Sequence, residues 1–110
     1  MEFTGAKSGS FLVLTVTGRM DALTAQEFEA ECGRWLEAGE KRLVADLAGL
    51  DYISSAGLRS ILAAAKKLKA QGGDLAFCCL AGIVAEVFAV SGFAKLLPVF
   101  PTREEALARP

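Results

Sequence analysis

Apolar side chains recur along the chain with two different periods, and this predicts a protein built from both strands and helices. Residues 2–4 and 11–17 are predicted as two strands, separated by a turn-rich stretch at 5–10. One face of the second strand carries three aliphatic side chains, those of Leu12, Leu14 and Val16. We expect this face to lie in the core.

The first helix is predicted to begin near Ala25, because Thr24 and Glu27 have the spacing of a capping box. Gly39 is expected to end it. The apolar side chains between these limits recur at helical spacing, at Phe28, Cys32, Trp35 and Leu36. This pattern predicts an amphipathic helix packed against the sheet.

A nearly continuous apolar run at 43–47 predicts a third strand that is buried on both faces, as at the centre of a sheet. A second helix is expected after Ser54 and Ser55, and Gly72-Gly73 is expected to end it. The inner stripe of this helix is predicted to contain Leu58, Ile61, Leu62, Ala65 and Leu68.

Residues 75–94 contain one charged side chain, Glu86, and are long enough to be weighed as a membrane span. Because Gly82 and Gly92 interrupt this run, we favour a core strand at 75–80 followed by a short amphipathic helix. We therefore expect no membrane insertion. The apolar side of the helix would carry Ile83, Val84, Val87 and Phe88.

A short last strand is expected at 96–99, at a sheet edge because it contains Pro98. Thr102 and Glu105 form a second capping box, which predicts a closing helix at 103–108. The complete order predicts one α/β domain over residues 1–110. Its mixed sheet would have four to five strands, with about four helices packed against it.

Charge and cysteine usage narrow the class of protein. The formal net charge of −1 favours neither nucleic acid nor an acidic membrane as a partner. Three cysteines, Cys32, Cys78 and Cys79, suit the reducing cytoplasm, and no signal peptide is evident. Adjacent residues of a strand point to opposite faces, so Cys78 and Cys79 are expected to be poorly placed to pair. Since the chain lacks C-x-x-C spacing and histidine, we expect no bound metal and no cofactor.

The candidate chemistry lies in the segment DLAGLDYISSAGLR at 46–59, where Ser54 and Ser55 stand between a buried strand and a helix. Unpaired backbone N–H groups at a helix start favour an anion such as phosphate. The chain has no histidine to activate a serine in the usual way. We therefore expect a modified hydroxyl rather than a catalytic one, and no enzyme activity.

Two segments resemble the STAS domain, which sulphate-transporter tails share with bacterial anti-sigma factor antagonists. GRMDALTA at 18–25 resembles the family's segment G-x-[LM]-D-x-x-T-A before the first helix. The segment at 46–59 resembles D-L-S-x-[LV]-x-[FY]-[IM]-[DS]-S-[STA]-G-L, and is the more specific of the two. The order of elements matches along nearly the whole chain.

The resemblance implies an anti-sigma factor antagonist that is switched by phosphorylation, with Ser55 as the modified residue. It implies an anti-sigma factor that is also a serine kinase, and a protein phosphatase, as partners. Asp21 matches an acid that helps partner binding in the family. The partner-binding surface would include Asp21, Ser54, Ser55, Ala56, Gly57 and Arg59.

Other interpretations remain open at this point. Ser55 could serve as a helix N-cap, or Ser54 could cap the helix while Ser55 is modified. Asp21 could be a turn residue, and Gly57 could let its helix pack close to the sheet. The domain could instead be the cytoplasmic STAS subunit of a lipid-transport complex, and a homodimer is also open. A small serine hydrolase is disfavoured, because the chain has neither histidine nor a G-x-S-x-G elbow.

Overall fold

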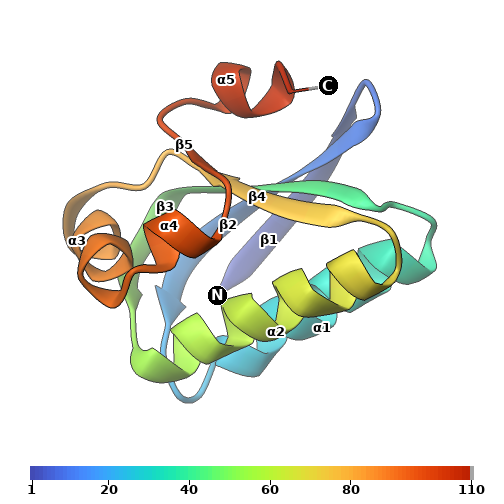
Figure 1. Cartoon of the computed structure of the whole chain (residues 1–110). Helices are drawn as coiled ribbons and strands as arrows, with labels where there is room; N and C mark the ends of the chain where they lie inside the picture. The colour runs from blue at the N-terminus through green and yellow to red at the C-terminus, as the bar shows by residue number, and fades with distance from the viewer. Residues whose placement is uncertain (110) are drawn as a thin grey trace.

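The fold is built on one sheet of five strands, whose order β1-β2-β3-β4-β5 follows the sequence. The structure is a computed structural model, and it describes residues 1–109 (Figure 1). β1 is antiparallel to β2, and each of the other neighbouring pairs is parallel. This arrangement confirms the predicted α/β fold with a mixed sheet.

The elements have the following bounds. The strands are β1 (Glu2–Ser8), β2 (Phe11–Met20), β3 (Arg42–Ile53), β4 (Asp74–Cys78) and β5 (Val99–Phe100). The helices of the described chain are α1 (Ala25–Glu37), α2 (Ser55–Ala70), α3 (Gly82–Ser91), α4 (Phe93–Leu96) and α5 (Arg103–Leu107).

The core lies on both faces of the central strand β3, as its apolar run predicts. Residues 43–47 are all buried. Leu43 and Ala45 belong to the larger cluster, which also holds buried side chains of α1, α2 and α3. Val44 belongs to the smaller cluster, together with Ala106 of α5. Figure 1 shows α1 and α2 on one face of the sheet and α5 on the other.

Strand β1 is held against α1 at the edge of the sheet by the tryptophan of the chain. The indole of Trp35 lies over Gly5, where an added Cβ would be 2.3 Å from the ring. Trp35 Nε1 donates a hydrogen bond of 3.0 Å to Glu31 of the same helix. The Trp35 ring can therefore lie at this position only because residue 5 has no side chain.

Three strands are longer than predicted. β2 runs to Met20 instead of residue 17, because it still pairs with β3 there. β1 pairs with β2 through Ser8 opposite Phe11, so the predicted turn at 5–10 shrinks to Gly9 and Ser10. β3 runs on to Ile53 although its second half is partly polar, because it continues to pair with β2 beyond a shift in register. Cross-strand pairing overrides the local sequence signals in all three strands.

The C-terminal third departs from the predicted boundaries. β4 ends at Cys78 instead of residue 80, because Cys79 adopts a left-handed backbone with φ 64°. Gly92, with φ 82°, ends α3 and opens the additional helix α4 where a strand was expected to begin. β5 is a sheet edge, as predicted, and Thr102 caps α5 by accepting a hydrogen bond from Glu105 N at 3.1 Å.

The buried stripe of α2 is shifted from the predicted one. Ile61 and Leu68 are buried as expected, but Leu58, Leu62 and Ala65 are half-buried at its margin. The remaining buried positions carry small residues, Gly57, Ser60 and Ala64. These small side chains let α2 pack closely, and Ser60 donates a hydrogen bond to the carbonyl of Ala25 at the start of α1.

Residues 75–94 form β4, the turn after it, α3 and the start of α4, in agreement with the core strand and short helix that we favoured. Within residues 1–109, no helix combines the length and the apolar character that crossing a membrane requires.

Candidate partner-binding site

The site begins at the junction of β3 and α2, where Ser54 serves as the N-cap of the helix. Its Oγ accepts a hydrogen bond of 3.2 Å from Gly57 N, and its backbone is extended, as capping requires. Ser54 N donates to the carbonyl of Met20 at 2.9 Å, which ties the junction to the end of β2. The capping role is therefore filled by Ser54 and not by Ser55.

Ser55 is the first residue of α2 and is exposed. Within the described residues its hydroxyl makes no hydrogen bond, so it is free to be modified. Arg59 lies one turn further along α2, is also exposed, and has no ion-pair partner among residues 1–109. Residues four apart on a helix are neighbours, so an anion on Ser55 would come within reach of Arg59.

Gly57 lies beneath this surface and not on it. A Cβ at this position would be 2.7 Å from Ile53 Cγ1 and 2.9 Å from the carbonyl oxygen of Met20. These distances are shorter than real contacts allow, so a side chain would force α2 away from the end of β2. Gly57 therefore allows the first turn of α2 to lie close to the ends of β2 and β3.

Asp21 organises the neighbouring loop between β2 and α1. Its Oδ1 accepts hydrogen bonds from Leu23 N at 3.0 Å and Thr24 N at 3.2 Å. The predicted capping box at Thr24 and Glu27 is wrong, because Thr24 makes no side-chain cap. The Thr24 Oγ1 instead donates a hydrogen bond to the carbonyl of Arg19 at 2.6 Å. The acceptor for the backbone N–H groups of this loop is the Asp21 carboxylate.

The hydrogen bond from Leu23 N lowers the pKa of the Asp21 carboxyl below its ordinary value of 3.8. A carboxyl whose pKa is lowered on folding stabilises the fold above its unfolded pKa, and this contribution disappears as the pH falls through the folded pKa. Asp21→Ala should therefore lower the free energy of unfolding at neutral pH, and the deficit should shrink at about pH 3. Denaturant titrations of both proteins at the two pH values measure this. An equal deficit at both would show that the carboxylate charge is not involved.

A groove of about 450 Å³ separates the first turns of α1 and α2. Small side chains leave this space open, and its lining consists of Ala22, Ala25, Gln26, Glu29, Ala56, Arg59, Ser60 and Ala63. Beside it, Leu23 is 91% exposed. The groove and the exposed Leu23 therefore lie side by side next to the start of α2.

Leu23 was missed by the sequence analysis. The available signal was an apolar residue inside an otherwise turn-like segment, outside the apolar stripe of the helix that follows. Of the predicted site residues, Ala56 and Arg59 line the groove, Ser54 and Ser55 begin α2, and Asp21 holds the adjacent loop. The structure thus brings the predicted residues to one end of the molecule, with Gly57 as support from below.

This chain belongs to the STAS domain family, whose sequence model matches residues 4–106. A relative from Bordetella bronchiseptica, named "Putative anti-sigma factor antagonist BtrV", is 43% identical over 108 residues, which are 98% of this chain and 93% of the relative.

Solved structures show the same fold. An anti-sigma factor antagonist from Mycobacterium paratuberculosis is similar with a TM-score of 0.84 and 24% identity, over 96% of this chain and 90% of that one. The Bacillus cell fate determinant SpoIIAA in its phosphorylated form has a TM-score of 0.69 and 19% identity, over 96% of each chain. These matches confirm the resemblance inferred from the two sequence segments.

Proposed function

We propose that this STAS domain is an anti-sigma factor antagonist that is switched by phosphorylation of Ser55. In its unmodified form it binds an anti-sigma factor that is also a serine kinase, and so releases a sigma factor for transcription. The kinase phosphorylates Ser55, and a protein phosphatase restores the active form. The observation that carries this proposal is the exposed and unbonded Ser55 hydroxyl at the first position of α2.

The relative of highest identity quoted above supports this function through its name, since it covers almost the whole chain. The structure of SpoIIAA in a phosphorylated form supports a phosphorylation switch on this fold. The proposed activity is binding, with the phosphoryl transfer performed by the partner. Such a partner places the protein in the cytoplasm, where sigma factors act.

The surface offers two kinds of contact to this partner. Leu23 supplies an exposed apolar side chain, and the groove between α1 and α2 supplies a cavity lined by Ala56 and Arg59. A phosphate on Ser55 would add between about −1.5 and −2 charge at neutral pH. Because Arg59 is one turn away, the phosphate would also pair with the Arg59 guanidinium. In the unmodified form this guanidinium would be available to the partner.

We expect the kinase to place phosphate on Ser55 and not on Ser54. The Oγ of Ser54 already accepts the capping hydrogen bond from Gly57 N, whereas Ser55 is exposed. The experiment captures the partner with the unmodified domain, incubates both with ATP, and maps the modified residue by mass spectrometry. Ser55→Ala should abolish the modification.

The matched control for this experiment is Ser54→Ala, which removes the neighbouring hydroxyl and leaves Ser55 in place. It should still accept phosphate, with some loss of stability from the missing cap, about 1 kcal/mol. Phosphate found on Ser54 of the unaltered protein, with Ser55 unmodified, would show that the modified serine has been assigned wrongly.

A further inference from the structure

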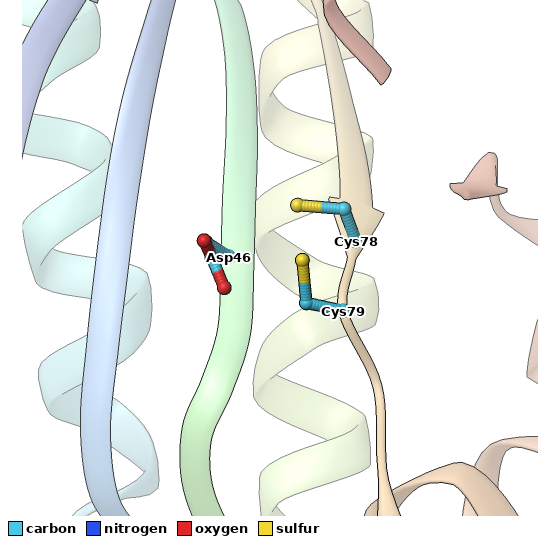
Figure 2. Close-up of side chains that lie close together, drawn as sticks. All are labelled: Asp46, Cys78 and Cys79. Atoms are coloured by element: carbon cyan, nitrogen blue, oxygen red, sulfur yellow. The ribbon is translucent and has the colours of Figure 1, made fainter. Parts of the chain in front are cut away.

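A second cluster of chemically active side chains lies at the carboxyl end of β4, on the face of the sheet that α5 covers. It contains Asp46 of β3 together with Cys78 and Cys79. One oxygen of the carboxylate and the two sulfur atoms all lie within 4.8 Å of one another. Figure 2 shows both thiol groups beside Asp46. This cluster takes no part in the partner-binding site described above.

The backbone of Cys79 produces this arrangement. The expectation that adjacent cysteines point to opposite faces is wrong here, because Cys79 lies beyond the end of β4 with φ 64°. The turn brings its sulfur to the same side as that of Cys78. A left-handed backbone is unfavourable for any residue with a Cβ, and such strain is concentrated at ligand-binding positions. Cys79 is the one non-glycine residue with positive φ among residues 1–109.

Asp46 is already oriented as a ligand would be. It is buried, with 6% of its surface exposed, and Oδ1 accepts a hydrogen bond of 3.0 Å from Ala48 N. Oδ2 accepts two from Arg103 of α5, at 2.6 and 3.1 Å. Carboxylates that ligate metals are typically held by such outer hydrogen bonds, which fix their direction. The three accepted bonds leave about one lone-pair site, on Oδ1, for an ion.

We propose that Asp46, Cys78 and Cys79 form a binding site for one thiophilic divalent cation of the zinc class. Tetrahedral zinc, with bonds of about 2.3 Å to sulfur and about 2.0–2.2 Å to oxygen, needs ligand atoms about 3.5–3.8 Å apart. The three atoms reach this spacing with shifts of about 1 Å from the present limit of 4.8 Å. The fourth position would be filled by water or by a group from another molecule.

The charges of the cluster balance with such an ion. A cysteine thiol with no ion bound is ordinarily protonated at neutral pH. Binding forms two metal–sulfur bonds, breaks two S–H bonds, and releases both protons to the solvent. The ion adds two positive charges and the thiolates two negative ones, so the ion pair of Asp46 with Arg103 remains neutral overall.

The test is a titration of the reduced protein with Cd²⁺, which gives an ultraviolet charge-transfer band when bound by thiolates. The unaltered protein should saturate at one ion per chain, and Zn²⁺ should compete for the site. Cys79→Gly should weaken binding about 100-fold or more, since loss of an outer partner alone costs about 10–100-fold. Glycine suits φ 64°, so this variant should fold at least as well, which thermal unfolding checks.

Cys32→Ala is the matched control, because Cys32 is buried in the other core cluster on the opposite face of the sheet. It should bind Cd²⁺ as the unaltered protein does. The proposal is overturned if no thiolate band appears with one equivalent of Cd²⁺, or if a folded Cys79→Gly variant binds the ion with unchanged affinity.

Discussion

Ser55→Asp is expected to weaken binding of the anti-sigma partner by about tenfold or more, or ~1.4 kcal/mol, while Ser55→Ala binds like the unmodified domain. The aspartate places a charge at the exposed first position of α2, beside Arg59 and the groove that the partner would fill. Calorimetry of the three proteins with the captured partner measures the difference. Equal affinities of Ser55→Asp and Ser55→Ala would exclude a charge switch at this residue.

The control for this comparison is Ser8→Asp, the same substitution at an exposed serine of β1 that pairs with the far end of β2. It lies opposite Phe11, nine residues from Met20, which is about 30 Å along the strand. It should leave the affinity unchanged. Both variants should fold normally, because Ser8 is exposed and an acidic group at Ser55, the start of α2, interacts favourably with the helix dipole. A clear fall in the stability of Ser55→Asp would indicate a conformational switch instead of a local one.

Gly57→Val is expected to lower the free energy of unfolding by about 3 kcal/mol, the upper part of the range for overpacked sites. The added side chain would begin 2.9 Å from the carbonyl oxygen of Met20, and a backbone atom cannot rotate away. Partner binding should also fall, because the displaced helix start carries Ser55. Denaturant titration gives the free energy, and binding measurements below the unfolding transition give the second effect.

Ala63→Val provides the matched comparison on the same helix. Ala63 is half-buried and lines the groove, where a larger side chain has room. We expect it to cost about 0.5 kcal/mol, the helix propensity difference alone. If Gly57→Val and Ala63→Val unfold at the same denaturant concentration, then close packing at position 57 does not support the helix start.

The sequence predicted those features that depend on local periodicity and on short segments with defined spacing. The central strand at 43–47 was evident because four of its five buried positions are apolar, with Asp46 as the exception. The cap of α5 by Thr102 was evident because its acceptor and donor are three residues apart. The same spacing at Thr24 and Glu27 gave a wrong prediction. Asp21, three residues before Thr24, accepts the hydrogen bonds of the loop instead.

The features that were missed depend on contacts between distant segments or on a single backbone angle. β3 extends to Ile53 because β2 pairs with it, which no local pattern encodes. The Cys79 sulfur lies beside that of Cys78 because Cys79 has φ 64°. Nothing in the neighbouring residues indicates that backbone angle. The prediction that Ser54 and Ser55 lie at the start of a helix was correct. The hydrogen bond from Gly57 N to Ser54 Oγ shows that Ser54 is the N-cap and leaves Ser55 without that role.

The seating of Trp35 over Gly5 also determines what intrinsic fluorescence can report. Trp35 is the single tryptophan of the chain, and it follows Ala25 by ten residues, about 15 Å along α1. The emission of its indole therefore reports the contact between β1 and α1 during unfolding. For binding studies a fluorescent reporter near Leu23 would lie closer to the groove than this indole does.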